Sequence, residues 1–502
     1  MSPQLPADCL KEIFELLNDD IRSLHSSINV SKLWCKIGIQ ILWRHPWKFT
    51  GTLNSKFFWP AIVKTLLSCM KDESLMILKQ MGIDISISNN KSPMFNYAGY
   101  CKYLSPWEIN RMVMVIQGRG WWFESNDMSP VEIVIEQELY KLFMSRCSTL
   151  KHLIIPKARI LTYPGATMCL SQLSALECST SIPSTFFKEM AQYCHNLQRL
   201  IVEPCDEDVE GLAVLITKQT GLREVELVPT KPKQIKTMEC HQIGKALVTQ
   251  ATSLKSLYIQ NYLCFAPELL ASFVNLVTLR VNICVRFHEG LSSSMSFPQL
   301  ETLEIFEDKS TPFDYYTKVI ESTGGNLEKI YFNNVSHADD QELRNYIHAI
   351  TFCCQNIRLV TIVLSNKIEI DELEQLLESC QKIEVLKLQA RSLKIIDGER
   401  ILQLLAVKAP RSLTTLNFDS ERPYGCWLFS YKALDEFLNT WKVRNMKPLS
   451  IYFEIACYEP GFNAKHYKII KKYLNEGVLK EFYEINNLCD PYKKWQCLGP
   501  WG

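Results

Sequence analysis

The chain has 502 residues, of which 47% are hydrophobic and 22% are charged, a composition that excludes disordered and collagen-like chains. This length exceeds one ordinary hydrophobic core, so several domains or a repeat array are expected. The 55 lysines and arginines nearly balance the 54 aspartates and glutamates, which argues against the basic face that nucleic acid or an anionic membrane would need.

The first fifty residues predict three short helices. Asn18-Asp19-Asp20 ends the first helix and can cap the second through a side-chain oxygen, and a third helix is expected from about Ser31 to Trp43. In the first two helices, apolar residues recur in steps of three and four, which places them on one helical stripe. They are Leu10, Ile13, Phe14, Leu17, Ile21 and Leu24.

Three motifs in this segment resemble the F-box over roughly residues 4 to 48. They read Leu5-Pro6-x-x-Cys9-Leu10-x-x-Ile13-Phe14-x-x-Leu17, then Asp20-Ile21-x-x-Leu24, then Val30-Ser31-Lys32-x-Trp34, with Cys9 where the family usually has Leu or Ile. The resemblance implies that residues 1–48 pack on a Skp-type adaptor. The implied adaptor-binding residues are Leu5, Pro6, Leu10, Ile13, Phe14, Leu17, Ile21, Leu24, Val30 and Trp34.

An ordinary helical cap at the end of a repeat array is the alternative for this segment. A cap explains the apolar stripe but not the three spacings together, so the F-box interpretation is preferred.

Residues 49–130 predict a helical linker, or N-terminal cap, between this unit and the rest of the chain. Helical periodicity is visible at Ile62, Leu66 and Leu67 and again over residues 107–116. The aromatic cluster Trp121-Trp122-Phe123 has no interleaved basic residues, which favours packing in a core over stacking on bases or sugars.

Residues 131–485 predict an α/β solenoid, a curved leucine-rich-repeat array of about twelve units, followed by a C-terminal tail over residues 486–502. The pattern Leu-x-x-Leu-x-Leu recurs at intervals of 22 to 32 residues, with a looser last copy near Leu449. Helical segments are expected between the strands, for example over residues 341–353 and 370–380. The first residues of the copies are Leu150, Leu173, Leu197, Leu222, Leu254, Leu276, Leu300, Leu327, Ile357, Ile383 and Leu413.

Cysteines precede the first leucine of several copies by three residues, as at Cys147, Cys194 and Cys380. This placement resembles the cysteine-containing leucine-rich repeats that are common behind F-boxes. All 19 cysteines are scattered, and no two have the Cys-x-x-Cys spacing. Buried thiols are therefore preferred over a metal site, for which Cys240-His241, Cys194-His195 and Cys353-Cys354 are the candidates. No metal and no cofactor is expected.

The side chains between the repeat leucines are expected on the concave face, which repeat proteins commonly use for recognition. Tyr258, Arg280, Glu304 and Tyr331, near the middle of the array, are the candidate target-binding residues. The alternative, that such side chains merely complete a solvated sheet, is equally compatible with the pattern. The central positions read Ile154, Glu177, Ile201, Glu226, Tyr258, Arg280, Glu304, Tyr331, Thr361, Lys387 and Asn417.

No catalytic motif is present in the sequence, neither a glycine-rich phosphate loop nor His-Glu-x-x-His nor Gly-x-Ser-x-Gly. The resemblance implies a non-catalytic substrate receptor of a Skp/cullin/F-box (SCF-type) ubiquitin ligase, with an unknown protein as substrate and no nucleic-acid or membrane partner. A stand-alone leucine-rich-repeat binder is the alternative function. The cysteine usage and the lack of a secretion-signal layout in Met1–Leu10 predict a cytoplasmic or nuclear location.

Overall fold

The computed structural model describes residues 5–48, 55–83, 93–119, 128–156, 159–230, 239–285, 295–306, 313–333, 339–364, 370–390, 395–420, 426–455 and 462–486. Two compact units divide the chain. The first comprises Met1–Val225 and Lys245–Gln250, and the second comprises Glu226–Gly244 and Ala251–Gly502. The tail expected over residues 486–502 lies outside the described residues except for Asn486, and the aromatic cluster at 121–123 lies outside them as well.

The first unit begins with the three predicted helices, α1 (Ala7–Leu16), α2 (Ile21–Ser27) and α3 (Lys32–Leu42). Side-chain caps begin two of them, because Asp20 accepts a hydrogen bond from the Ser23 amide (3.1 Å) and Ser31 accepts one from the Trp34 amide (3.2 Å). Each cap satisfies a backbone N–H that the first helical turn leaves without a partner. The polar break between the helices is therefore where the sequence predicted it.

Three further helices lie in residues 49–130, as the periodicity there predicted: α4 (Ser55–Ser68), α5 (Asp72–Gln80) and α6 (Pro106–Ile116). A fourth helix, α7 (Pro130–Arg146), occupies the start of the range in which the solenoid was expected. Between α5 and α6 lie a short 3-10 helix η1 (Ala98–Tyr100) and a strand β1 (Tyr103–Leu104). The segment is thus not wholly helical. The first strand forms because Tyr103 and Leu104 pair in parallel with His152 and Leu153 of the first repeat, a partner some fifty residues away in the chain.

Strands and helices alternate in the remainder of the first unit. The strands β2 (His152–Ile154), β3 (Ala175–Cys178) and β4 (Arg199–Val202) pair in parallel, in chain order. The 3-10 helix η2 (Ile160–Thr162) and the helices α8 (Ala166–Leu170), α9 (Ser184–Met190) and α10 (Glu210–Thr217) connect or follow them. The boundary between the units falls within β5 (Glu224–Leu227) and α11 (His241–Val248).

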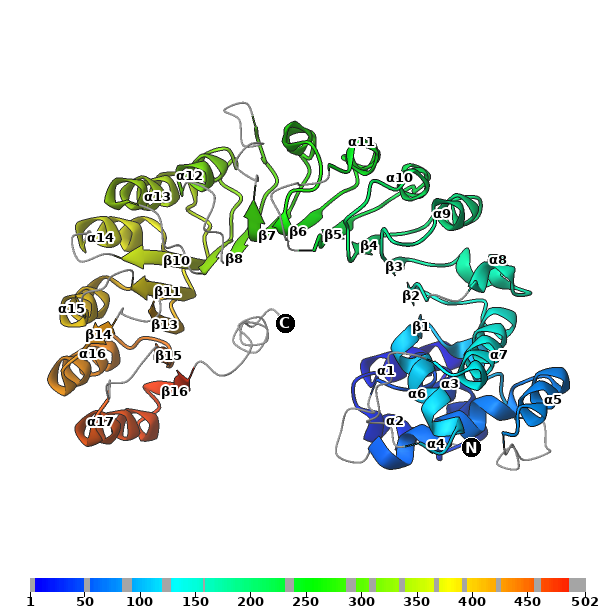
Figure 1. The fold of residues 1–502 in the computed structure, drawn as a ribbon. Coiled ribbons are helices and arrows are strands. Elements are labelled where there is room, and N and C mark those ends of the chain that lie inside the picture. Colours follow the sequence, from blue (N-terminus) through cyan, green and yellow to red (C-terminus); the bar gives the residue numbers. More distant parts are fainter. Residues whose placement is uncertain are drawn as a thin grey trace. The chain divides into compact units, whose positions relative to one another are not determined.

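The second unit repeats the same arrangement over a longer stretch, with strands on the inner side of a curved array and helices on its outer side (Figure 1). Its strands in the large parallel sheet are β6 (Ser256–Tyr262), β7 (Thr278–Val285), β8 (Thr302–Phe306), β9 (Lys329–Asn333), β10 (Leu359–Leu364), β11 (Val385–Ala390), β13 (Thr415–Ser420), β15 (Leu449–Ile455) and β16 (Leu479–Asn486). A separate two-stranded sheet pairs β12 (Ile395–Asp397) with β14 (Cys426–Leu428).

Helices cover the outer side of these strands in the second unit. They are η3 (Pro267–Ser272), α12 (Phe313–Glu321), α13 (Asp340–Cys353), α14 (Ile370–Ser379), α15 (Gly398–Lys408), α16 (Tyr431–Val443) and α17 (Ala464–Asn475). The predicted helices at 341–353 and 370–380 are therefore confirmed to within a residue. The predicted α/β solenoid is confirmed as well.

The repeat leucines form the core between strands and helices. Leu173, Leu222, Leu254 and Leu300 each expose 0% of their surface, and the strand of each repeat starts two residues after its first leucine. The buried leucines of a strand all lie on one of its faces, because successive side chains of a strand point to opposite faces. Of the helices in the described residues, each is too short or too polar to cross a bilayer.

The repeat cysteines belong to this core. Cys194 and Cys380 are fully buried, and burial raises the pKa of the Cys194 thiol to about 12 and that of Cys380 to about 11. Their thiols therefore stay protonated near neutral pH, where a thiol is a poor nucleophile and a poor metal ligand. Both act as small apolar residues, as the sequence predicted.

Candidate functional site

The three N-terminal helices enclose a small core of their own. Leu10, Phe14 and Leu24 are each 1% exposed, and Phe14 meets the Trp34 ring edge-on at a centroid distance of 5.2 Å. Leu17 and Trp34 are partly buried against the same cluster. Four of the ten residues implied as adaptor-binding therefore pack in this core, and Leu10 is buried as well.

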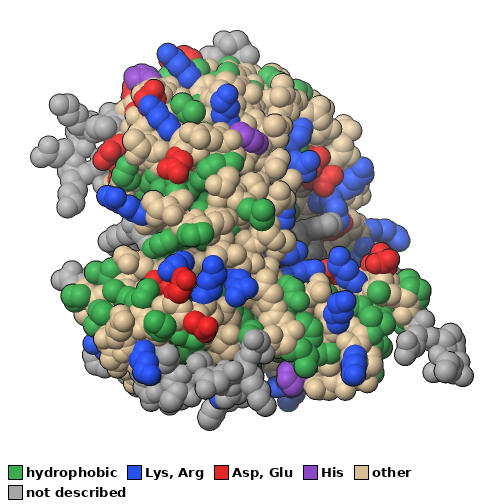
Figure 2. All heavy atoms as spheres, turned by 90° about the vertical axis from the view of Figure 1, so that its right-hand side faces the viewer, with side chains coloured by type: hydrophobic (Ala, Val, Ile, Leu, Met, Phe, Trp, Pro, Cys, Tyr) green, Lys and Arg blue, Asp and Glu red, His purple; other side chains and the backbone are tan. Residues whose placement is uncertain are grey.

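The other implied residues lie on the surface. Leu5 is 50% exposed, Ile13 is 42% exposed and Val30 is 62% exposed, and Pro6 is exposed too, while Ile21 is partly buried. Exposed apolar side chains cost free energy in contact with water, so these residues are candidates for contact with another protein. On the face shown in Figure 2, hydrophobic side chains lie among lysines and arginines.

Leu16 is a further exposed residue that the F-box motif did not single out. It is 87% exposed, at the end of α1. Ile13 and Leu16 are three residues apart and so share one face of the helix, while Leu10, Phe14 and Leu17 share another. The sequence contains this signal, because Ile13 and Leu16 are spaced as a second apolar stripe on the helix. It was missed because all the apolar residues were assigned to one stripe. The exposed apolar residues of this unit, Leu5, Pro6, Ile13, Leu16 and Val30, are together called here the apolar docking face.

Charged contacts brace the end of α1. Arg44, just after α3, makes a two-point ion pair with Glu15, with its Nη2 atom 2.5 Å from Oε1. The hydrogen bond from Arg44 holds the pKa of Glu15 below its ordinary value. Lys48 pairs with Asp19 in the same region. These contacts fix α1 relative to α3 and so position Ile13 and Leu16.

The three-helix unit is also joined to the rest of the first unit through the residues after α3. The Lys102 amide donates to the Arg44 carbonyl at 2.8 Å, and the ring of Trp43 lies 4.7 Å from that of Tyr97. Burial lowers the pKa of His45 to about 4, so its imidazole is neutral near pH 7 and stacks on Tyr103 at 4.4 Å. The apolar docking face is therefore carried on a braced element rather than on a free helix.

The candidate target-binding residues of the second unit stand in one register across the sheet. Tyr258 pairs with Arg280, Arg280 with Glu304, and Glu304 with Tyr331 on successive strands. Their exposure differs from the expectation for a concave face, because Tyr258 is 8% exposed, Glu304 is 4% exposed and Tyr331 is 2% exposed. The Arg280 side chain keeps 41% of its surface.

Most of these side chains have partners within the chain. The Glu304 carboxylate lies 2.6 Å from Nε of Arg280 and also pairs with Lys329. The Tyr331 hydroxyl accepts a hydrogen bond from Lys387 at 3.3 Å. Of the four, Arg280 offers the largest surface to a partner. Target binding by this row stays a prediction.

Comparisons with known proteins give structural neighbours only. No family model and no curated protein matches the chain. The solved structures include the complex of Rad7 and Elc1 from yeast, which is 12% identical with a TM-score of 0.38 over 92% of this chain and 98% of that one.

Two bacterial structures are also similar. The leucine-rich repeat-containing protein LegL7 of Legionella pneumophila is 12% identical, with a TM-score of 0.29 over 69% of this chain and 87% of that one. A Bacteroides fragilis protein is 12% identical, with a TM-score of 0.26 over 68% and 75%. At these identities and TM-scores the likenesses carry no functional argument.

Proposed function

We propose that this chain is the substrate-recognition subunit of an SCF-type ubiquitin ligase. Its N-terminal helices bind a Skp-type adaptor, and through it a cullin scaffold, and the repeats hold a substrate protein. The observation that carries the proposal is the apolar docking face, formed on a unit with the F-box spacings. The chain supplies no catalytic group in this role, because the bound substrate reacts through proximity to an enzyme that the scaffold brings.

The separation of the apolar residues supports adaptor binding over the alternative of a plain cap. A cap needs its apolar residues only against the array that it covers. Here Phe14 and Leu24 already close the core, and Trp43 already contacts the following segment. Ile13, Leu16 and Val30 are left exposed, and they need a partner to leave water.

Ile13→Asp and Leu16→Asp, each made in the full chain, test the proposal. We expect either variant to retain at least about tenfold less Skp-type adaptor in co-purification, because a carboxylate buried in an apolar interface loses its hydration. Met76→Asp is the matched control, since Met76 is 60% exposed on α5 and lies outside the docking face. Adaptor retained is measured per mole of chain.

These point variants give a clearer test of adaptor binding than removal of residues 1–48. That deletion also uncovers Tyr97 and other rings that the residues after α3 cover. Leu5→Ala combined with Pro6→Ala is expected to weaken retention as well. A wild-type chain that fails to retain adaptor would refute the proposal. Equal retention by wild type, Ile13→Asp and Leu16→Asp would show that the docking face is elsewhere.

A further inference from the structure

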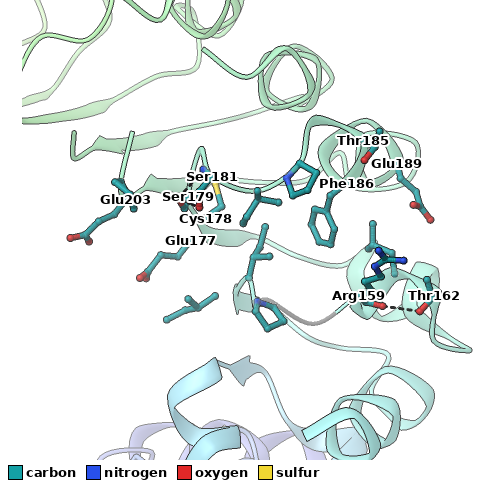
Figure 3. A pocket seen from close by; sticks show the side chains of 17 residues that line it. Arg159, Thr162, Glu177, Cys178, Ser179, Ser181, Thr185, Phe186, Glu189 and Glu203 are labelled. Atoms are coloured by element: carbon teal, nitrogen blue, oxygen red, sulfur yellow. Dashed lines mark hydrogen bonds between the residues drawn. The ribbon is translucent and has the colours of Figure 1, made fainter. Parts of the chain in front are cut away.

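A groove of about 880 Å³ extends across the first three repeats, within the first unit. One wall comes from the end of β2 and from η2, with Ile154, Pro156 and Leu161. The facing wall comes from the segment after β3 and from α9, with Ile182 and Phe186 (Figure 3). Volumes of this size accommodate ligands of several side chains, and apolar walls of this kind bind by excluding water.

Two carboxylates lie at one end of this groove, Glu177 on β3 and Glu203 directly after β4 (Figure 3). The Glu203 amide donates to the Cys178 carbonyl at 2.7 Å, which keeps Glu203 beside β3. Neither carboxylate forms an ion pair with another described residue. The positive charge of Arg199 acts on Glu177, but the Nε atom of Arg199 lies 3.5 Å from a carboxylate oxygen of Glu224.

The electrostatics of this end favour a cation from outside. Burial raises the pKa of Glu177 and the negative charge of Glu203 raises it further, and these effects outweigh the lowering by Arg199. Two carboxylates that repel each other are stabilised when a positive charge sits between them. At the other end of the groove, Arg159 and Glu189 carry one charge of each sign (Figure 3). The excess negative charge is therefore at the Glu177 end.

We propose that this groove binds an extended segment of the substrate protein in which a lysine or arginine and a large apolar residue are two positions apart. The cationic head lies between Glu177 and Glu203, and the apolar side chain packs against Ile182 and Phe186. The inference rests on the proposed receptor function and names the chemistry of its substrate. An extended peptide fits because the anionic and apolar parts of the groove lie side by side, as alternate side chains on one face of a strand do.

Fluorescein-labelled hexapeptide pools test the proposal by fluorescence polarisation on the full chain. Each pool fixes one central residue, lysine, acetyl-lysine or glutamate, and draws its neighbours from Leu, Ile, Phe and Ser. We expect the lysine pool to bind at least about tenfold more tightly than the other two, because acetylation removes the charge and glutamate reverses it. Phe186→Ser is expected to weaken the binding of the lysine pool about fivefold.

The combined variant Glu177→Gln and Glu203→Gln is expected to abolish the preference for lysine over acetyl-lysine. Asp72→Asn with Glu73→Gln is the matched control, because both residues are exposed on α5 and the net charge changes equally. Thermal unfolding of each variant establishes that it is folded. Equal binding of the lysine and acetyl-lysine pools would overturn the proposal, as would a persisting preference in the glutamine variant or strongest binding of the glutamate pool.

Adaptor retention, measured on the same preparations, separates the two proposals. If the chain retains adaptor but shows no preference for the lysine pool, only the proposal of peptide binding in the groove is refuted. A lysine preference in a chain that retains no adaptor refutes the ligase role and leaves the groove as a peptide-binding site.

Discussion

Lys387 is a charged residue on the inner face of the sheet that is buried in an ion pair. Its side chain is 1% exposed, and Nζ lies 2.8 Å from Oδ2 of Asp419, whose side chain is 9% exposed. The same ammonium lies 4.9 Å from the centre of the Tyr331 ring. Removing one partner of a buried ion pair leaves the other charge without compensation, which costs far more than losing a pair in water.

Lys387→Met is therefore expected to lower the free energy of unfolding by about 3–5 kcal/mol. Lys442→Met is the matched control, because Lys442 pairs with Glu476 at 3.0 Å with its side chain 54% exposed. Exposed pairs contribute about 0–1 kcal/mol, so this control is expected to unfold like wild type. Urea denaturation followed by circular dichroism measures both. Equal urea midpoints for the two variants would contradict the importance of the buried pair.

Glu108 on α6 is a second charged residue in a buried place. It is 6% exposed, and the Ser105 hydroxyl donates to its carboxylate. Burial raises the pKa of Glu108 to about 7, above the value of 4.5 for the free side chain. The folded state thus favours the protonated form. Its stability contribution is fully present below pH 4.5 and is lost as the pH rises through about 7.

Glu108→Gln is expected to remove most of this pH dependence, because glutamine has similar size and stays neutral. Between pH 5 and pH 8 the wild type should lose about 1–2 kcal/mol more stability than the variant, a figure discounted for water near the carboxyl group. Thermal unfolding of both proteins at the two pH values measures the difference. Parallel losses in the two proteins would show that Glu108 is not the group responsible.

Helix α1 illustrates what a pattern of apolar residues predicts and what it leaves open. The spacing predicted the helix and its approximate ends, because a 3.6-residue period follows from sequence alone. It did not predict that Phe14 would be 1% exposed and its neighbour Ile13 42% exposed. That difference depends on where α3 crosses α1, which is a matter of packing between helices.

The crossing of the N-terminal helices depends on Gly38 in the middle of α3. A Cβ atom at this position would lie 2.6 Å from Cγ2 of Ile28 and 3.4 Å from the Phe14 ring. The contact is too close for a methyl group, and overpacking of this kind typically costs about 1–3 kcal/mol. Alanine is also the better helix former by about 0.5–1 kcal/mol, so the two effects oppose each other.

Gly38→Ala is therefore expected to destabilise the chain slightly and to reduce adaptor retention severalfold, since α3 must move away from the contact. The double variant Gly38→Ala with Ile28→Ala gives the added methyl group room and is expected to regain retention. Adaptor co-purification and thermal unfolding measure the series. Unchanged retention in the single variant would show that the docking face tolerates a shift of α3.

At the scale of the whole molecule, the repeats were the part most readily predicted. Each unit buries the same leucines against its neighbours, so one local pattern specifies strand, helix and stacking together. Strand β1 was missed, because Tyr103 and Leu104 are a short apolar pair whose partner strand at His152 lies far along the chain. Local periodicity carries no information about such pairing.

The sequence by itself determined the three N-terminal helices, the alternation of strand and helix, and the buried leucines and cysteines, because these follow from short-range spacing and hydrophobicity. Only the tertiary structure decided which side chains of these elements are accessible. Tyr331 became 2% exposed within a row expected to face outward, and Leu16 became 87% exposed. The groove also needed the folded chain, since Phe186, Glu177 and Glu203 belong to different elements that meet only when successive repeats stack. Accessibility is a property of packing between elements, which no spacing within one element encodes.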